Sequence, residues 1–479
     1  MKTKFLKVIY ACAILLLQAG CQALAAPSST PTPAPLSGPR ASAAGASALV
    51  QYQEPGTVGV TLAPVDAGTG RLVDGFAPIN LGYEPDYAFS ADRERLAFAS
   101  TIQPSCTAKC LHILDLRTWK ETLQPPLPLD PDGSLYAVLA FDPAGTKLAV
   151  ALNDAIGPGA QLLLVDLAQA KVIRQVKLDA SVMQLGFTPA GALAVYGMQA
   201  PATPTVSQGT PPVPPENHMY AALYDGASLQ ELWRQELDNV SFGNDEAGMI
   251  DPTQGRWLNP AAVFSPDYAR LYVLPADLPE LVSVDFAART VQTFEIGPRQ
   301  GLLERLLTAG ASVAYAKALN GASKNAAISP DGKTLYVVAQ TNTAVKDASG
   351  GWTSQQTMLG LQVVDVSDGT ELGSLASEAW DVRVGLDGRS ILLTGVDQVS
   401  DGTYGTWTDL VDAAALKVVQ RFKGDVTPSR LLDGETALLS LVWTNSGANT
   451  VAVYDPASFT LRSQRTETSD NYAAWLPVP

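Results

Sequence analysis

Cysteine and histidine are the residues of this chain whose chemistry is easiest to test by spacing. Cys106 and Cys110 are separated by three residues, and in an exported protein such a pair predicts a local disulfide that pins the loop 101–110, with free thiols as the alternative. The motif does not fit c-type haem attachment, which needs two residues between the cysteines and an adjacent histidine. The chain has 2 His, His112 and His218, so a zinc site or a Ser-His-Asp triad has few side chains to draw on.

Other short motifs are explained by turns. Gly332-Lys333-Thr334 looks like the tail of a phosphate-binding loop, but Ala327 stands where that loop requires glycine. The acidic stretches 130–133 and 365–371 lack the full ligand spacing of a calcium loop. His112 lies between Leu111 and Ile113, a pattern typical of a core or edge histidine. No catalytic constellation emerges from the residue types and spacing.

The elements that position these residues come from a repeat. In the stretch that starts at Ile328 (ISPDGKTLYVV), proline presets the turn, aspartate suits its third position and glycine accepts the left-handed conformation that closes a hairpin. The β-rich run after it predicts a strand. Related turns follow Phe89, Phe141, Phe187, Phe264, Val384 and, in a weaker copy, Arg430.

A second unit lies between these turns: an apolar run that ends in aspartate, a turn, and another apolar run. We expect each aspartate to accept backbone N–H bonds in its turn, a structural role. These aspartates are Asp66, Asp115, Asp166, Asp225, Asp285, Asp365, Asp412 and Asp455. Each period therefore carries two hairpins, or four strands.

This two-part repeat resembles the YVTN-type and WD-repeat-like β-propellers over residues 48–479. The resemblance implies an all-β fold, a single ring of four-stranded blades. Seven blades follow from the pairs of hairpins. Strands expected at 48–53, 58–65 and 72–80, with one inner strand from 472–478, would close an eighth blade and remove free sheet edges. We therefore expect eight blades, with seven as the alternative.

The lengths of the connections distinguish the two faces of such a ring. Hairpin turns are short, whereas the links on the opposite face are long, and loops on a rigid scaffold often carry binding sites. These links are 101–110, 153–160, 199–218, 238–260, 297–325 and 340–360. Residues 301–315 have leucines at helical spacing and predict a short amphipathic helix.

Two of these links supply candidate ligand-binding residues. Asp251, Arg256 and Trp257 combine an acid, a cation and an aromatic ring that could hold a cation or a sugar; a solvated loop with Trp257 packed down is the alternative. Lys317, Lys324 and Asn325 are expected just before an inner strand, where their side chains can reach the mouth of the channel.

The N-terminus predicts export. Residues 1–21 combine three lysines with an apolar stretch too short to span a bilayer. Ala19-Gly20-Cys21 resembles the end of a bacterial lipobox, which implies lipid attachment at Cys21; Gln18 departs from that pattern, and cleavage after Ala25 would instead release a soluble protein. Residues 22–47 are a disordered Ala/Pro/Ser/Thr linker by composition, and residues 48–479 form the propeller domain.

Charge and composition narrow the function. A formal net charge of -15 and a pI near 4.6 argue against nucleic-acid binding, which needs clustered basic residues. We expect a monomeric, membrane-tethered extracytoplasmic module, without metal or cofactor, that binds an unknown protein or small molecule through its loop-rich face. The alternative is a propeller enzyme, either a metal-dependent lactonase-like hydrolase or a quinoprotein-like dehydrogenase.

Overall fold

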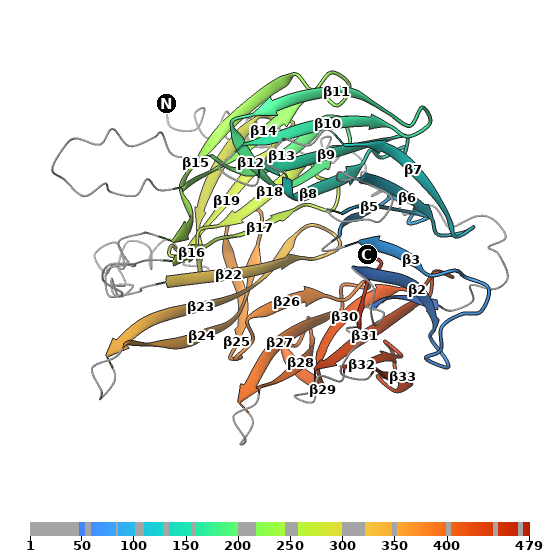
Figure 1. Cartoon of the computed structure of the whole chain (residues 1–479). Helices are drawn as coiled ribbons and strands as arrows, with labels where there is room; N and C mark the ends of the chain where they lie inside the picture. Colours follow the sequence, from blue (N-terminus) through green and yellow to red (C-terminus); the bar gives the residue numbers. More distant parts are fainter. Residues whose placement is uncertain are drawn as a thin grey trace, which may run out of the picture. The chain divides into compact units, whose positions relative to one another are not determined.

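The computed structural model describes the chain in thirteen stretches, which are residues 47–52, 59–82, 85–100, 110–127, 134–154, 159–199, 217–244, 257–298, 321–346, 352–398, 404–443, 449–467 and 473–479. The chain divides into two compact units, Met1–Gly38 and Pro39–Pro479, and all described residues belong to the second. Every element in these stretches is a β-strand (Figure 1). Among them there is no helix of the length and apolar character that crossing a membrane requires.

Six sheets of four strands account for most of the described chain. Their strands, sheet by sheet and from one edge to the other, are β34 (Ala473–Trp475), β1 (Ser47–Tyr52), β2 (Val60–Asp66) and β3 (Ile79–Gly82); β4 (Asp86–Phe89), β5 (Arg95–Ser100), β6 (Cys110–Asp115) and β7 (Lys120–Pro126); β8 (Ser134–Phe141), β9 (Lys147–Asp154), β10 (Ala160–Asp166) and β11 (Lys171–Leu178); β17 (Ala261–Phe264), β18 (Arg270–Leu274), β19 (Glu280–Asp285) and β20 (Thr290–Glu295); β26 (Asp381–Val384), β27 (Ser390–Gln398), β28 (Tyr404–Asp412) and β29 (Lys417–Lys423); and β30 (Asp425–Arg430), β31 (Thr436–Trp443), β32 (Asn449–Tyr454) and β33 (Leu461–Glu467).

The remaining strands form one sheet of ten. In order they are β12 (Ala180–Phe187), β13 (Leu193–Gln199), β14 (Asn217–Tyr224), β15 (Glu231–Asn244), β16 (Trp257–Asn259), β22 (Gly321–Ile328), β23 (Thr334–Lys346), β24 (Trp352–Asp365), β25 (Thr370–Leu375) and β21 (Gly297–Pro298).

The blade count differs from the prediction. The described strands form six separate four-stranded sheets, where the sequence predicted eight blades or seven. The two other runs of four, β12–β15 and β22–β25, are merged because β16 pairs antiparallel with β15 and parallel with β22. The sequence repeat marks the hairpins correctly but gives no sign of this bridging strand.

The repeated turns form as their residue types predict. Gly332 has a φ of 70°, the left-handed conformation that closes the hairpin between β22 and β23. The Ser329 hydroxyl donates to Asp331 and accepts from the Thr334 amide, and the serines at positions 90 and 265 make equivalent bonds. The eight repeat aspartates all accept backbone N–H bonds in their own turns, so the structural role predicted for them is confirmed.

Buried side chains join each group of four strands to the next. Shared apolar clusters lead from the β4–β7 sheet through β8–β11, β12–β15, β17–β20, β22–β25, β26–β29 and β30–β33 to the sheet of the chain ends and back to β4–β7. Each fully buried leucine or phenylalanine in such a cluster contributes roughly 1.5–3 kcal/mol. This closed circuit of four-stranded units is a β-propeller, and it lies within Pro39–Pro479.

The chain ends share one sheet, as predicted. Strand β34 pairs antiparallel with β1, and the β1–β2 and β2–β3 pairs complete four strands. The indole N–H of Trp475 donates to the Ser440 carbonyl at 2.9 Å, and the Arg430 amide donates to the Val478 carbonyl at 2.9 Å. The C-terminal residues therefore hold the sheet of the chain ends against the β30–β33 sheet.

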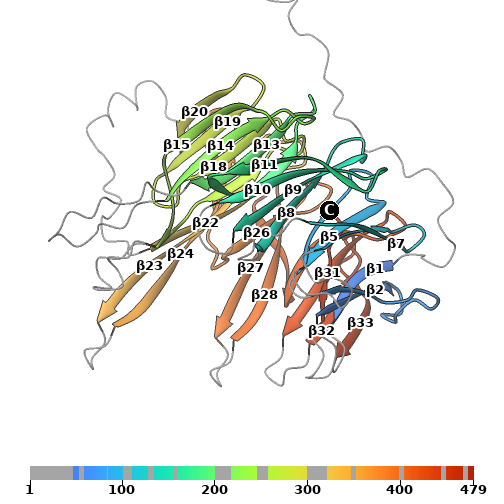
Figure 2. The ribbon, with the colours of Figure 1, turned by 45° about the horizontal axis from the view of Figure 1, so that its top comes forward.

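Some predicted links are in fact strands. The link expected at 340–360 is largely an extension of the β23–β24 hairpin, which projects from the ring together with β27–β28 (Figures 1 and 2). Paired strands replace a loop here because the Thr/Gln-rich stretches on both sides face each other in register. The helix expected at 301–315 and most of the other long links lie outside the described residues.

Candidate functional site

The predicted site residues are only partly within the described chain. Cys21, Cys106, Asp251, Arg256 and Lys317 lie outside it, and of Cys110 only the backbone, at the start of β6, is described. The lipid attachment, the disulfide and the Asp251–Arg256 part of the loop cluster therefore stay predictions. Trp257 is on β16 with 40% of its surface exposed, so it is not packed down.

Lys324 and Asn325 lie within the inner strand β22, and not before it as expected. The Lys324 ammonium donates to the carbonyls of Pro275 at 2.6 Å and Leu278 at 2.5 Å, on the neighbouring β17–β20 sheet. Burial lowers the pKa of Lys324 to about 8. The Asn325 amide donates to the Trp380 carbonyl at 2.7 Å, just before β26. Both side chains thus already join β22 to its neighbours, and ligand binding by them stays a prediction.

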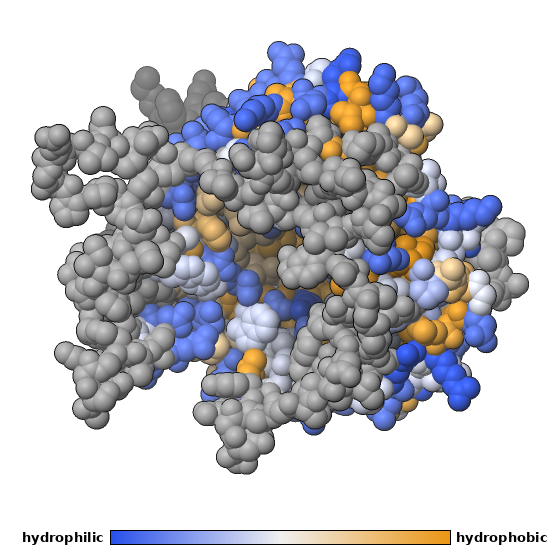
Figure 3. All heavy atoms as spheres, in the orientation of Figure 1, coloured by the Kyte–Doolittle hydropathy of each residue, from blue (hydrophilic) through white to orange (hydrophobic). Residues whose placement is uncertain are grey.

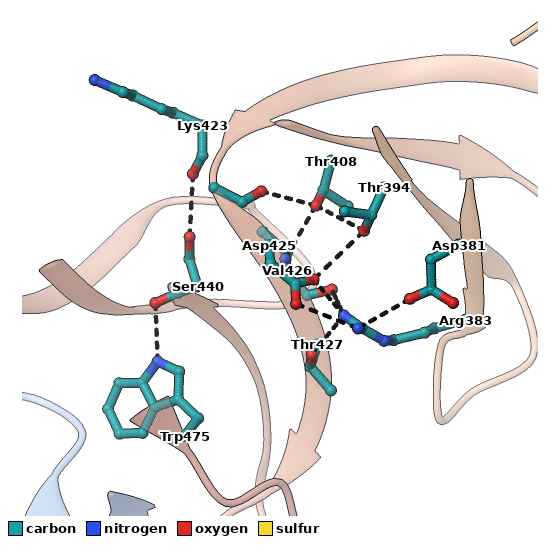
Figure 4. A network of polar contacts seen from close by, with 11 residues as sticks. Asp381, Arg383, Thr394, Thr408, Lys423, Asp425, Val426, Thr427, Ser440 and Trp475 are labelled. Carbon is teal, nitrogen blue, oxygen red and sulfur yellow. Dashed lines mark hydrogen bonds and ion pairs between the residues drawn. The ribbon is translucent and has the colours of Figure 1, made fainter. Parts of the chain in front are cut away.

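An acid–arginine network connects the inner strands β26 and β30 (Figure 4). Arg383 bonds both carboxylate oxygens of Asp425, and donates to the Thr427 hydroxyl at 2.7 Å and to the Val426 carbonyl at 3.1 Å. On its own strand it pairs with Asp381 at 2.9 Å. Burial raises the pKa of Asp381, and Arg383 opposes this rise. One guanidinium thus serves two carboxylates, which leaves a local excess of negative charge.

Buried threonines extend this network into the sheet. Thr394 bonds Thr408 at 3.1 Å, and Thr408 donates to the Gly424 carbonyl and accepts from the Val426 amide. Because these bonds satisfy the backbone where β29 passes into β30, they fix the position of Asp425. The network is therefore a rigid joint between blades, and its charged part is the portion that remains partly exposed.

A separate cleft lies between the β22–β25 strands and the β26–β29 sheet. It has a volume of about 550 Å³, and its walls come from β24, from the link after β25 and from β28–β29. Met358 and Leu359 line one side, Glu378 the link, and Val418 and Arg421 the opposite side. A pocket of this volume is large enough for a small ligand or a few residues of a peptide.

Arg421 is held rigidly in this wall. It donates to both oxygens of Asp409, at 2.7 and 2.8 Å, and its guanidinium lies 4.1 Å from the centre of the Trp407 ring. The indole packs over Gly395, where any Cβ would come within 2.2 Å of the ring, so glycine is required there. The Arg421 side chain is still 54% exposed. It therefore presents a fixed positive charge to the cleft.

The β24 strand offers an unpaired edge beside this cleft. Its residues 361–364 pair with β25, whereas residues 352–358 pair with β23 alone among the described strands. Leu359 on this edge is 54% exposed and Val418 across the cleft is 40% exposed. An unpaired edge with apolar side chains next to it is a template for another strand.

His112 is buried on β6, stacked on Phe98 with ring centres 4.9 Å apart, and its Nδ1 contacts Glu121. This is the core environment expected from its flanking residues. Within the described stretches, no group of three or more His, Cys, Asp or Glu residues is placed to hold a metal ion.

Sequence reasoning missed Arg383, Asp425, Trp407, Asp409 and Arg421. Arg383 gave no signal in the sequence, because other inner strands also carry charged residues, such as Asp86 on β4 and Lys324 on β22. The cleft residues gave no signal in the sequence either, because they come from three separate segments. Only the packing of two neighbouring groups of strands brings these segments together.

The four-stranded units and their closed circuit define the class of protein, a β-propeller. The dehydrogenase in the structure "Dihydro-heme d1 dehydrogenase NirN in complex with DHE" is 13% identical over 88% of this chain and 74% of that chain, with a TM-score of 0.51. At this identity the likeness shows the fold alone.

Two further structures are less similar. The β-propeller domain of Cps50 (Swd1) from Myceliophteria thermophila is 12% identical over 81% of this chain and 94% of that chain, with a TM-score of 0.39. The periplasmic gluconolactonase PpgL from Pseudomonas aeruginosa is 16% identical over 80% of this chain and 99% of that chain, with a TM-score of 0.38. No family model matches the chain. No curated protein matches it either.

Proposed function

We propose that this chain is a binding module that takes an extended segment of a partner protein into the cleft between β24 and β28–β29. The observation that carries the proposal is the unpaired edge of β24 at 352–358, next to exposed Leu359 and Val418. In this mode, backbone hydrogen bonds to the edge supply affinity, and alternate side chains of the added strand enter the cleft.

The charges of the cleft set the kind of segment that fits. Arg421 uses its Nε and one Nη for Asp409, which leaves the N–H groups of its other Nη for an incoming carboxylate or carbonyl. Leu359 and Val418 offer apolar surface on the two sides. The segment therefore alternates apolar residues with polar ones and carries an acidic residue that meets Arg421.

The proposal includes a tether. Lipid attachment at Cys21, followed by the linker 22–47, would hold the propeller at the extracytoplasmic side of a membrane and leave its loop-rich face free. Incorporation of labelled palmitate into the wild-type chain, and its loss in Cys21→Ser, tests the tether separately from binding. A wild-type chain without label would favour the alternative, a secreted soluble protein cut after Ala25.

A peptide display library provides the probe for the cleft. Peptides selected on the full-length protein are synthesised, and their Kd is measured against Leu359→Glu. The added charge meets the acidic segment in the cleft, so we expect affinity to fall at least about tenfold, or 1.4 kcal/mol. Leu372→Glu is the matched control, because Leu372 is equally exposed on β25 of the same blade but outside the cleft. Equal effects of the two substitutions would contradict the proposal.

The alternative is an enzyme, either a metal-dependent lactonase-like hydrolase or a quinoprotein-like dehydrogenase. Asp381 favours it, because a carboxyl whose pKa is raised by burial beside an arginine is a common acid–base group. The hollow near the centre of the face in Figure 3 carries polar as well as apolar side chains on its walls. Stoichiometric Ca²⁺ or Zn²⁺ in the purified protein would favour the hydrolase over the binding module.

A further inference from the structure

The β23–β24 hairpin continues beyond its blade as a two-stranded ribbon (Figures 1 and 2). On one side β22 pairs with β23 only as far as Asn342, and on the other side β25 pairs with β24 only from Leu361. The ribbon begins at Gly360, whose φ of 82° is left-handed, and the register between β23 and β24 shifts at this point. Residues 352–358 therefore present the backbone groups of one strand edge outside the blade.

This edge lacks the residues that keep strand edges apart. Natural proteins protect edge strands with charged side chains or proline. The outer strands β7, β11, β29 and β33 each carry at least two charged residues. Between Asp347 and Asp365, in contrast, the sequence has neither a charged residue nor a proline. The exposed side chains of Gln355, Gln356 and Thr357 on this edge are all neutral.

The neighbouring β27–β28 hairpin shows the difference. It also extends beyond its blade, because β26 pairs with β27 only as far as Thr394 and β29 pairs with β28 only from Trp407. The extension of β28 is limited to residues 404–406, which is shorter than the usual strand of about 5–6 residues. On β27 the extension carries the exposed charge of Asp397. Only the β24 edge combines sufficient length with neutral side chains among these two extensions.

The β24 edge can pair with a second copy of itself. Two identical antiparallel strands related by a twofold axis pair symmetrically about one residue, and the run 352–358 has its midpoint at Gln355. The opposed pairs are then Trp352 and Met358, Thr353 and Thr357, Ser354 and Gln356, and Gln355 with its own copy. Threonine pairs and polar pairs stabilise neighbouring strands, and no like charges face each other.

The charge of the whole chain sets a condition on this pairing. Each copy has a formal net charge of -15, so two copies repel each other. A contact through a projecting ribbon keeps the bodies of the two propellers apart (Figures 1 and 2). Salt screens charges that are separated by more than about 10 Å at 0.1 M ionic strength. Self-association through this edge should therefore strengthen as the salt concentration rises.

We propose that two copies of this chain form a dimer through residues 352–358 of β24, paired antiparallel about a twofold axis at Gln355, in place of the monomer expected from the sequence. The dimer covers the edge beside the cleft. A further consequence rests on the proposed function: the partner segment must displace the second copy, so its apparent affinity falls as the protein concentration rises.

A charge at the twofold axis tests the dimer. Gln355→Lys places one lysine opposite the other, and like charges directly opposite destabilise a strand pair. Sedimentation of the full-length chain at about 100 µM should show self-association at least about tenfold weaker than in the wild type. Gln292→Lys is the matched control, because Gln292 is an exposed glutamine on β20, and it should leave self-association unchanged.

A mixture of two variants separates pairing from damage to the fold. Gln355→Glu should also weaken the dimer, but an equal mixture of Gln355→Lys and Gln355→Glu should form it again, because opposite charges then meet at the axis. No dimer in the wild type at about 100 µM and 0.5 M salt would overturn the proposal. So would unchanged self-association of a folded Gln355→Lys variant.

The same samples distinguish this proposal from the proposed function. A wild-type chain that stays monomeric but binds the selected peptides would overturn the dimer and leave the cleft as a peptide site. A dimer whose self-association is weakened by Gln355→Lys, in a chain that yields no binding peptides, would support the dimer and contradict the proposed function.

Discussion

Two sets of polar residues hold this propeller together in different ways. The repeat aspartates sit in the turns between the third and fourth strands of each blade, and each bonds its own turn within three residues. The joints between blades use a different side chain at each place, such as Asp86, Gln184, Asn325 and Arg383. The blade is thus built by repetition, whereas the ring is closed by individual contacts.

The turn residues and the joint residues should also differ in how much they contribute to the stability of the fold. A turn aspartate makes bonds within its own turn, and where it is exposed, as Asp412 is, water can replace those bonds in part. A joint residue such as Arg383 bonds groups more than forty residues away in the sequence, and its partners would be left as partly buried charges without it. Substitutions at joints should therefore cost more than substitutions in turns.

Arg383→Met should have the largest effect. It leaves Asp381 and Asp425 close together without their cation, so we expect a loss of about 2–3 kcal/mol in the free energy of unfolding, measured by urea denaturation at pH 7. Adding Asp425→Asn should recover part of that loss, because it removes one of the two repelling charges. A double variant that is no more stable than the single one would show that the network does not act through charge.

Lys324→Met should show a pH-dependent effect. The folded-state pKa of about 8 is below the unfolded value of 10.5, so the contribution of Lys324 to stability is full above 10.5 and is lost as the pH falls through about 8. The stability of the wild type relative to the variant should rise by about 1–3 kcal/mol between pH 7 and pH 10.5. Urea unfolding curves across this range measure the difference, and a flat profile would contradict it.

Asp381→Asn should show the opposite slope in the acid range. Burial raises the folded-state pKa of Asp381 above 3.8, so the contribution of the carboxyl to stability is full below about 3.8 and is lost as the pH rises through the raised value. Wild type should therefore gain stability relative to the variant as the pH falls from 7 to 4. Chemical denaturation at several pH values checks this, with Asp412→Asn, whose carboxyl is exposed in a turn, as the control.

Asp412→Ala should have the smallest effect. It removes two bonds to the amides of Ala414 and Ala415 in an exposed turn, which corresponds to about 1 kcal/mol. Thermal unfolding of this variant beside Arg383→Met would give the comparison directly. If the turn substitution cost as much as the joint substitution, the distinction between the two sets of residues would be wrong.

The same distinction explains what the sequence could predict. The hairpin turns, the role of the eight aspartates and the shared sheet of the chain ends follow from residues a few positions apart or from counting strands, and all are confirmed. The blade count is wrong because β16 joins β15, the strand before it, to β22, which is distant in sequence. Arg383 and the Trp407–Arg421 cleft follow from packing between neighbouring blades, for which a single sequence carries no local pattern.

The pairing of β34 with β1 has a consequence for how the molecule is made. The first described strand must wait for residues 473–475 before it acquires its inner neighbour, so the ring stays open until the chain has been made as far as β34. Until then, the edges of β1 and of the outlying blades are exposed to other chains. Pairing with β34 is therefore the step that protects β1 from strands of other molecules.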